Sequence, residues 1–347
     1  MLLITQHIGE TLTQQIQQTP HDRLFVLCDE VTARLCWPLV SHLAPLHDIT
    51  PIDIPPTDQA KNLQTLTTVW TALGQGGATR HSLLVNLGGG MVTDLGGFAA
   101  STFKRGITYI NVPTTLLAMV DASVGGKTGI NFGGLKNEIG VFSQPQAVLL
   151  DTRFLRTLDT ENLLSGYAEM LKHGLISHTA SHLSQLLDFD IQQPDYPLLS
   201  QLVATSVAVK QHVVEQDPHE QGLRKVLNLG HTIGHALESL ALTRKPLLHG
   251  YAVAWGLVCE LYLACAKCKF PTHYLRTLAH FVATHYGQPP YTCDDYPQLL
   301  QLMTHDKKNT AGTINFTLLS DVGQPLLDQT ATPSEICEAL DFLRDGL

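Results

Sequence analysis

Two kinds of hydrophobic pattern follow each other along this chain. Up to about residue 155, short apolar or β-branched runs alternate with helical stretches: "RLFVLCD", "ITPIDIP", "SLLVNLGGG", "TYINVP" and "AVLLD". Short runs of this kind predict buried strands, and helices between most of them predict a mainly parallel α/β sheet. We therefore expect residues 1–158 to form an α/β domain.

From about residue 160 onward, long helical patterns are separated by polar or proline-containing breaks such as "DIQQPDYP" and "YGQPPYTCDDYP". We expect residues 159–347 to form an all-α domain. The run 251–266 is apolar except at Glu260. It is shorter than the roughly 20 residues that span a bilayer, so it predicts a buried core helix rather than a membrane segment.

Composition narrows the range of partners and locations. A formal net charge of −9 gives no global field that would attract nucleic acid. The N-terminus lacks a charged segment followed by an apolar core, so we expect no secretory signal and a cytoplasmic location. The seven cysteines lie mostly in apolar runs, which is typical of reduced thiols. Cys265 and Cys268 form a lone C-x-x-C, and the helical pattern around them favours packing over a zinc site.

A glycine-rich turn follows the strand "SLLVNLG" and precedes a helical pattern. Gly88, Gly89 and Gly90 would let backbone N–H groups approach a pyrophosphate at a helix N-terminus. Thr93 occupies the last position of the G-x-G-x-x-G pattern, so a tight structural turn remains an equal interpretation. Asp29 at an earlier strand end and Asp94 in the helix each suit either a ribose contact or an ordinary polar position.

The next segment combines cations with glycines and hydroxyls. A P-loop requires G-x-x-x-x-G-K-[ST], and "DASVGGKT" lacks the first glycine. Several cations on glycine-punctuated loops near strand ends favour capture of a phosphorylated or carboxylated small molecule, although each alone suits a solvated surface charge. The polar residues of this segment are Lys104, Arg105, Thr114, Thr115, Asp121, Lys127, Lys136 and Asn137.

A metal site is suggested by Glu169, His231 and His249, since one carboxylate with two imidazoles is a recognised zinc set. His235 lies four residues after His231 in "NLGHTIGHALE". That spacing places both rings on one helix face, as in H-E-x-x-H sites, and leaves open whether both bind one metal. With 17 histidines in the chain, spacing alone does not choose among sets, and each histidine also suits simple packing.

Several blocks of the chain, taken together, resemble the 3-dehydroquinate synthase family. They are "LGGGMVTDLGGFAASTFKRGITYINVPTTLLAMVDASVGGKTGIN", "KNEIGVF", "AEMLKHG", "GLRKVLNLGHTIGHALE", "HGYAVAWG" and "HDKKN", in the family's order from about residue 85 to 310. The resemblance implies a homodimer with a Rossmann-like NAD-binding domain and a helical metal-binding domain. It also implies conversion of 3-deoxy-D-arabino-heptulosonate 7-phosphate to 3-dehydroquinate and phosphate, in the shikimate pathway. The implied steps are transient oxidation by NAD, β-elimination of phosphate, reduction and intramolecular aldol closure.

The resemblance also assigns residues by position. Glu169, His231 and His249 match ligands of Zn²⁺ or Co²⁺, and His235 matches a histidine that relays a proton. Asp121 matches a polar residue at the reacting carbons. Matches to the substrate's surroundings are Arg105, Lys127, Asn137, Lys172, Lys210, Arg224, Asn228, Lys307 and Lys308. Matches to the dinucleotide contacts are Asp29, Asp58, Lys61, Gly89, Gly90, Asp94, Thr114, Thr115 and Lys136.

Two positions depart from the family pattern on the adenosine side. Val31 stands where an asparagine is usual, and Asp58 stands where a glutamate is usual. Three alternatives remain: a related sugar phosphate cyclase such as 2-deoxy-scyllo-inosose synthase, a metal-dependent polyol dehydrogenase that releases NADH, and a non-enzymatic metabolite-binding protein. The cations at Lys136, Arg224 and "HDKK" favour a substrate that carries a carboxylate.

Overall fold

The computed structural model describes residues 1–242, 244–304 and 314–346, which form two compact units. The predicted Lys307 and Lys308 lie outside the described residues.

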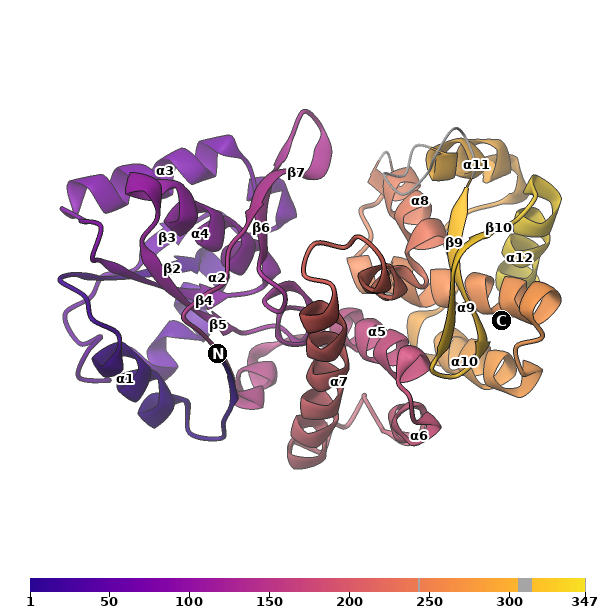
Figure 1. Cartoon of the computed structure of the whole chain (residues 1–347), viewed down its shortest axis with the longest axis horizontal. Coiled ribbons are helices and arrows are strands. Elements are labelled where there is room, and N and C mark those ends of the chain that lie inside the picture. Colours follow the sequence, from indigo (N-terminus) through magenta and orange to yellow (C-terminus); the bar gives the residue numbers. More distant parts are fainter. Residues whose placement is uncertain (243, 305–313, 347) are drawn as a thin grey trace. The chain divides into compact units, whose positions relative to one another are not determined.

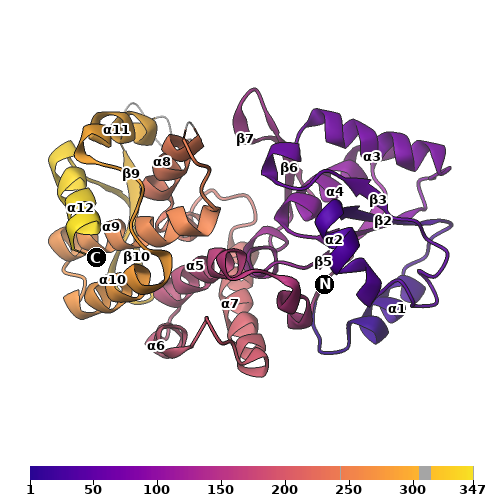
Figure 2. The same ribbon diagram turned by 180° about the vertical axis from the view of Figure 1, so that it is seen from behind.

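The first unit, Met1–Asp159 with Tyr196–Ser200, is built on a six-stranded sheet in the order β1-β8-β5-β4-β2-β3. Its neighbouring strands pair in parallel. Figures 1 and 2 show α3 and α1 on opposite sides of this sheet. The strands are β1 (Leu2–Ile4), β2 (Leu24–Asp29), β3 (Ile52–Ile54), β4 (Leu83–Gly88), β5 (Thr108–Pro113) and β8 (Ala147–Leu150), and the helices are α1 (Ile8–Gln18), α2 (Glu30–Leu35), α3 (Leu63–Gln75) and α4 (Gly90–Thr102).

The hydrophobic runs explain why this sheet is central. Every residue of β4 is buried, and so is all of β5 after Thr108. Strands that are apolar on both faces need cover on both faces, which is the arrangement of a parallel α/β sheet. Helix α4 starts directly after β4. It lies so close to the sheet that a Cβ added at Gly96 would come within 2.1 Å of Oδ1 of Asn86. The predicted α/β domain is confirmed.

A separate hairpin extends from the first unit. Its strands β6 (Lys127–Phe132) and β7 (Leu135–Phe142) pair antiparallel, with Phe132 opposite Leu135. Gly133 and Gly134 form the connection with φ of +59° and +81°, values that suit a two-residue hairpin turn. Every residue of β7 is exposed. The sequence predicted only glycine-punctuated loops here.

The second unit, Thr160–Asp195 with Gln201–Leu347, is mainly helical, as predicted. Its central helix α9 packs against α5, α8, α10, α12 and β9. Helix α9 is long and apolar enough to cross a membrane, but 67% of its most apolar window is buried, as in a core helix. The elements are α5 (Thr160–Ile176), α6 (Ala180–Asp188), α7 (Tyr196–Gln216, of which the part from Gln201 belongs to this unit), α8 (His231–Leu242), α9 (His249–Cys268), α10 (Thr272–Tyr286), α11 (Tyr296–Thr304), β9 (Asn315–Asp321), β10 (Gln324–Thr330) and α12 (Pro333–Asp345).

The second unit also contains two strands that the all-α prediction did not include. Strands β9 and β10 pair antiparallel, and Gly323 between them has φ +75°. Four residues of β9, from Phe316 to Leu319, are buried, and β9 packs on α9. An apolar run of this length is ambiguous between helix and strand in the sequence, and the hairpin partner settles it.

Candidate active site

Three side chains of the second unit converge on one point. Glu169 lies within α5, His231 is the first residue of α8, and His249 is the first residue of α9. Nε2 of His231 and Nε2 of His249 each lie 3.3 Å from the same oxygen of Glu169, Oε1. The possible ligand atoms of the three residues lie within 4.8 Å of one another. The sequence places these residues far apart, and the helix packing brings them together.

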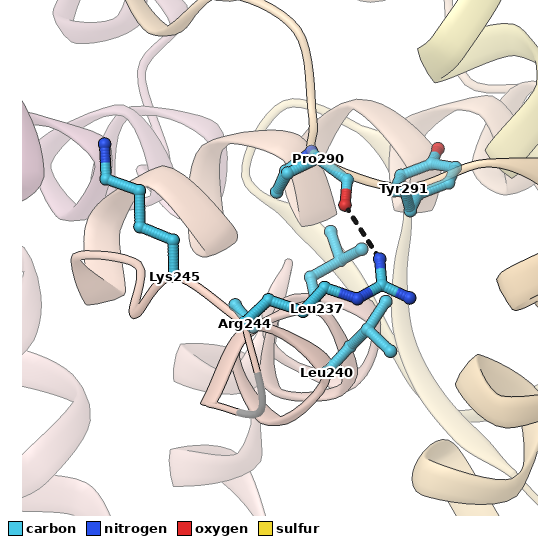
Figure 3. Close-up of a pocket in the computed structure, with 7 residues that line it drawn as sticks. Leu237, Leu240, Arg244, Lys245, Pro290 and Tyr291 are labelled. Carbon is cyan, nitrogen blue, oxygen red and sulfur yellow. Dashed lines mark hydrogen bonds between the residues drawn. The ribbon is translucent and has the colours of Figure 1, made fainter.

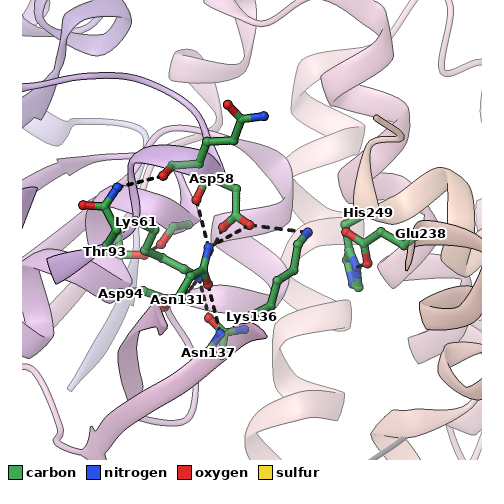
Figure 4. Close-up of polar contacts among 12 residues, drawn as sticks. Asp58, Lys61, Thr93, Asp94, Asn131, Lys136, Asn137, Glu238 and His249 are labelled. Atoms are coloured by element: carbon green, nitrogen blue, oxygen red, sulfur yellow. Dashed lines mark hydrogen bonds and ion pairs between the residues drawn. The ribbon is translucent and has the colours of Figure 1, made fainter. Parts of the chain in front are cut away.

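Hydrogen bonds on the far side of each ring orient the two imidazoles. Nδ1 of His231 lies 3.0 Å from the carbonyl oxygen of Leu229, and Nδ1 of His249 lies 3.3 Å from Oε2 of Glu238. Both partners are acceptors, so each Nδ1 donates and a neutral ring carries its lone pair on Nε2. Carbonyl and carboxylate partners of this kind are the usual supports of metal-binding histidines. Figure 4 shows the pair formed by His249 and Glu238.

The charges around Glu169 favour its ionised form. Burial acts to raise the pKa of Glu169, but Lys172 and then His231 lower this pKa well below its usual value. Burial and the Lys172 ammonium lower the pKa of His231 to about 3. Burial also acts to lower the pKa of His249, but the nearby carboxylates of Glu169 and Glu238 outweigh it and raise the pKa to about 10.

These residues fit a divalent metal ion. Both oxygens of Glu169 are buried and make no hydrogen bond of normal geometry within the described residues, although basic groups lie close to them. Lys172 forms an ion pair with Oε2, so Oε1 is the oxygen that faces the two Nε2 atoms. One carboxylate oxygen and two imidazole nitrogens are ligands that Zn²⁺ accepts, and they leave coordination positions for a substrate.

His235 lies beside this set without belonging to it. Its ring centroid is 5.3 Å from that of His231, with the ring planes at 90°, and 6.2 Å from that of His249. Four-residue spacing therefore brings both rings to one side of α8, but only His231 faces Glu169. The split between a ligand and a neighbouring histidine, which the family resemblance implied, stays a prediction.

Three of the predicted substrate-binding residues of the second unit lie on α7 or on the short helix Leu223–Asn228. Arg224 is buried and donates from Nη1 to the carbonyl of Pro218 over 2.6 Å. Asn228 donates from Nδ2 to Glu220 over 3.2 Å. Lys210 on α7 is also buried. Two of the predicted cations are thus held in the interior of this unit, where a charge needs an anionic or polar partner.

The loop that precedes Arg224 is fixed by one carboxylate. Asp217 accepts from the backbone N–H groups of Gln221, Gly222 and Arg224 over 2.9, 2.7 and 3.0 Å. These bonds, that of Gln221 first, lower the pKa of Asp217 to about 2. The sequence analysis did not select Asp217, although an aspartate before a turn of polar and glycine residues is a recognised loop signal.

In the first unit, the predicted pyrophosphate contacts lie at the carboxyl ends of β4 and β5. Gly89 is the N-cap residue of α4, and the N–H of Thr114 donates to the carbonyl of Gly88 over 3.0 Å. A Cβ at Gly89 would lie 3.0 Å from Cγ2 of Thr115, and one at Gly90 3.1 Å from Cβ of Ala122. This helix start therefore presents backbone without side chains, as an approaching pyrophosphate requires.

A network of polar residues joins the 3-10 turn Asp58–Ala60 to the hairpin (Figure 4). The buried ammonium of Lys61 lies 3.0 Å from Oδ2 of Asp94, 2.5 Å from Oδ1 of Asn137 and 3.5 Å from Oδ1 of Asp58. Lys136 approaches the other oxygen of Asp58 at 3.4 Å. These five predicted residues therefore form one cluster.

The two carboxyl groups of this cluster differ in their environment. Burial acts to raise the pKa of Asp58, but Lys61 and Lys136 lower it overall. The same effect of burial dominates at Asp94, where it raises the pKa despite the opposing ammonium of Lys61.

Asn131 holds the cluster together, and the sequence analysis missed it. Its Nδ2 donates to the carbonyl of Asp58 over 2.9 Å, its Oδ1 accepts from the N–H of Asn137, also over 2.9 Å, and its N–H donates to the carbonyl of Lys61 over 2.7 Å. Asn137 has φ +52°, a conformation that such bonds stabilise. The only sequence signal was its place in the block "GGKTGIN".

The remaining predicted residues of the first unit lie on other elements. Asp29 caps α2, and its Oδ1 accepts from the N–H groups of Val31 and Thr32. This leaves Oδ2 outside these contacts. Arg105 lies in a tight turn with φ +70°, Asp121 lies in the π-helical turn Ala118–Ala122, and Lys127 is the exposed first residue of β6.

Two further residues of the second unit were missed. Glu238 lies on α8, two turns after His231, and supports His249. His173 is buried one turn after Glu169 on α5, with Nδ1 2.7 Å from the hydroxyl of Ser206. Buried charged or polar residues on helices of mainly apolar composition were the available signal for both.

A small cavity of about 50 Å³ lies at the other end of α8 (Figure 3). It is lined by Leu237, Leu240, Ala241, Arg244, Lys245, Pro290 and Tyr291. Arg244 is already bound to Asp295 and to the carbonyl of Pro290. None of the predicted site residues lines this cavity, so we assign it no part in the active site.

Comparisons with known proteins agree with these features. A model of the 3-dehydroquinate synthase N-terminal region matches residues 51–165, and a model of the C-terminal region matches residues 166–309. The 3-dehydroquinate synthase of Parabacteroides distasonis is 51% identical over 346 residues, which cover 99% of this chain and 98% of that protein.

Solved structures of sugar phosphate cyclases share the fold. A 2-epi-5-epi-valiolone synthase from Streptomyces hygroscopicus with NAD⁺ and Zn²⁺ bound superposes with a TM-score of 0.86 at 26% identity, covering 99% of this chain and 96% of that one. A 2-deoxy-scyllo-inosose synthase with carbaglucose-6-phosphate, NAD⁺ and Co²⁺ gives 0.85 at 23% identity, covering 98% and 95%. Since the family models together span most of the chain and the first relative matches nearly all of it, the chain belongs to the 3-dehydroquinate synthase family.

Proposed function

We propose that the protein converts 3-deoxy-D-arabino-heptulosonate 7-phosphate to 3-dehydroquinate and phosphate, with NAD and Zn²⁺ or Co²⁺ as cofactors. The observation that carries this proposal is the convergence of two Nε2 atoms on one oxygen of Glu169. It is the donor set of a catalytic zinc site, on a chain whose family performs this reaction. The related cyclases with NAD⁺ and Zn²⁺ or Co²⁺ support the choice of cofactors.

The two cofactors have distinct tasks in this proposal. A metal ion held by Glu169, His231 and His249 would stabilise negative charge on the oxygen of the hydroxyl group that is oxidised. NAD would accept a hydride at that carbon and return it later in the same turnover, so no NADH is released. The ketone formed between these transfers acidifies the neighbouring C–H, and phosphate then leaves by β-elimination.

Residues of the second unit move protons and hold anions. His235, whose ring lies beside those of His231 and His249, accepts the proton of the reacting hydroxyl. Lys172 keeps Glu169 ionised through their buried ion pair. The substrate carries a phosphate and a carboxylate, and the cations proposed to bind them from this unit are Lys210, Arg224, Lys307 and Lys308, with Asn228 as a hydrogen-bond donor.

Residues of the first unit bind the cofactor and complete the substrate contacts. Gly89, Gly90, Thr114 and Thr115 form the pyrophosphate site at the start of α4. The cluster of Asp58, Lys61, Asp94 and Lys136, together with Asp29, contacts the rest of the dinucleotide. Arg105, Asp121, Lys127 and Asn137 contact the substrate.

We also propose a cytoplasmic homodimer. The outer edge of β7 pairs with no strand among the described residues, and Leu135, Ile139 and Val141 on it are exposed. An exposed edge strand with apolar side chains favours pairing with another chain, and a second copy in an isologous arrangement would cover both edges at once. Sedimentation of the wild type against an Ile139→Lys variant tests this, since a dimer formed through β7 should dissociate in the variant and one formed elsewhere should not.

The reaction itself is tested with purified protein, the heptulosonate phosphate, NAD⁺ and Zn²⁺. Phosphate should be released in step with 3-dehydroquinate, and a metal-stripped sample should release neither. No release above the stripped control refutes the proposal. Release of phosphate from a different sugar phosphate, without formation of 3-dehydroquinate, would favour another cyclase. Steady accumulation of NADH would favour a polyol dehydrogenase.

A matched pair of variants tests the assignment of the two histidines. His231→Ala should lose bound metal, since it removes a ligand. His235→Ala should keep the metal stoichiometry of the wild type and lose turnover. Equal loss of metal in both variants contradicts the assignment.

A further inference from the structure

A fully buried carboxylate of the second unit takes no part in the metal set. Glu260 lies on α9, three turns after His249, and its side chain is 0% exposed. Its Oε2 accepts from the N–H of Gly230 over 2.6 Å, and its Oε1 accepts from the N–H groups of Thr232 and Ile233 over 3.1 and 3.4 Å. One side chain thus binds the backbone on both sides of His231.

This arrangement replaces an ordinary helix cap. The first N–H groups of a helix have no partner within the helix, and a serine, threonine, asparagine or aspartate just before it usually binds them. Helix α8 is preceded by Gly230, with φ +80°, which has no side chain for this task. Glu260 supplies the acceptor from another helix, and a negative charge is favourable at that end of the helix dipole. The charge-assisted bonds offset the cost of burying it.

The same point is fixed by close contact between the two backbones. Gly256 lies one turn before Glu260, and a Cβ on it would come within 1.9 Å of the carbonyl oxygen of Gly230. Helix α9 therefore lies directly against the residue that precedes His231. These contacts set the position of the His231 backbone relative to α9. Helix α9 also carries His249.

We propose that Glu260 is a positioning residue for the metal set, a role that rests on the function proposed above. It fixes the backbone from residue 230 to 233, and through it the ring of His231, whose Nδ1 is bound to the carbonyl of Leu229. Ligand distances at a zinc site are held within about 0.2 Å, so a small displacement of this backbone weakens binding. Glu260 is not a member of the group of residues whose ligand atoms converge, so this role acts through the backbone beside His231.

The test measures binding of the metal alone to the full chain. Metal-stripped wild type, Glu260→Gln and Glu260→Met are titrated with Zn²⁺ against a chromophoric chelator, and the visible absorption of each Co²⁺-loaded protein is recorded. Glutamine keeps one acceptor oxygen, so we expect an affinity about 10-fold below that of the wild type, and about 100-fold below it for methionine, within the range for supporting residues of metal sites. The Co²⁺ bands should shift in the same order.

A matched control separates this role from general loss of a helix cap. Glu335 accepts from the N–H of Thr332 over 2.7 Å and caps α12 in the same unit. Glu335→Gln makes the same chemical change at another helix start, and it should leave Zn²⁺ affinity and the Co²⁺ spectrum unchanged.

Three outcomes overturn the proposal. The first is that Glu260→Gln keeps the Zn²⁺ affinity and the Co²⁺ spectrum of the wild type. The second is that Glu335→Gln loses as much Zn²⁺ affinity as Glu260→Gln does. The third is that Glu260→Gln does not fold even with saturating Zn²⁺, which would mean that Glu260 has a structural role alone. A wild type that binds no Zn²⁺ instead refutes the proposed function itself, and the two failures are therefore distinguishable.

Discussion

Replacing Gly256 with alanine should destabilise the protein, although alanine is the better helix former. In the interior of an exposed helix this change gains up to about 1 kcal/mol. At Gly256 the added methyl group would lie 1.9 Å from the carbonyl oxygen of Gly230 and 2.9 Å from the nitrogen of Gly234. These are backbone atoms, so no side-chain rotation can relieve the contact.

The size of the effect follows from these distances. An ordinary contact begins at 3.4 Å, so helices α8 and α9 must separate by about 1.5 Å at this point. Overpacking of a well-packed core costs about 1–3 kcal/mol, and rigid backbone neighbours favour the upper end. After subtracting the gain in helix propensity, we expect a net loss of about 2 kcal/mol in the free energy of unfolding. Zn²⁺ affinity should fall as well, because the contact adjoins His231.

The assay is urea unfolding followed by circular dichroism, with Zn²⁺ affinity measured on the same samples. Gly74→Ala provides the control, since Gly74 lies in α3 and an added Cβ there meets nothing within 4 Å. That variant should gain about 0.5–1 kcal/mol and bind Zn²⁺ as the wild type does. A Gly256→Ala protein that is as stable as the wild type, with unchanged affinity, would refute the argument that this contact sets the spacing of the two helices.

Three other substitutions test separate parts of the site. Asn131→Ala removes the hydrogen bond to the carbonyl of Asp58, and in steady-state kinetics it should raise the KM for NAD by about 10-fold with a smaller change in kcat. An unchanged KM would exclude a role of Asn131 in holding the residues that bind NAD. Glu238→Gln should weaken Zn²⁺ binding by about 10-fold because it alters the support of His249, and equal affinity in chelator competition contradicts this. The folded-state pKa of Asp217 is about 2 against an ordinary 3.8, so its stabilising contribution is complete above the ordinary value and is lost as pH falls from there towards 2. Asp217→Asn should therefore flatten the decline of urea stability across that interval, and an unchanged slope speaks against the shift.

The α/β half could be predicted because its signal is local. Residues 83–88 are apolar except at Asn86, and a short run of this kind is typical of a strand covered on both faces. The hairpin of β9 and β10 was missed for the opposite reason. Residues 316–319 are apolar except at Thr317, a pattern that suits a helix or a strand, and pairing with β10 decides between the two.

The metal set shows where sequence reasoning needed help. Spacing placed His231 and His235 on one face of α8, but it could not show which ring faces Glu169, because that depends on the packing of α5 against α8 and α9. The family resemblance implied the split between His231 and His235, which stays a prediction. Glu260 stood out only as the single charged residue of an apolar run, and its partners on α8 depend on tertiary contacts that no local pattern contains.

The central claim is that NAD is restored within each turnover. The most direct measurement supplies metal-loaded protein with NAD⁺ equimolar to its active sites and an excess of the heptulosonate phosphate, then counts 3-dehydroquinate formed per NAD while recording NADH absorbance. The account predicts many molecules of product per NAD and no net NADH. One equivalent of NADH per molecule of substrate consumed, with turnover stopping when the NAD⁺ is spent, would contradict it.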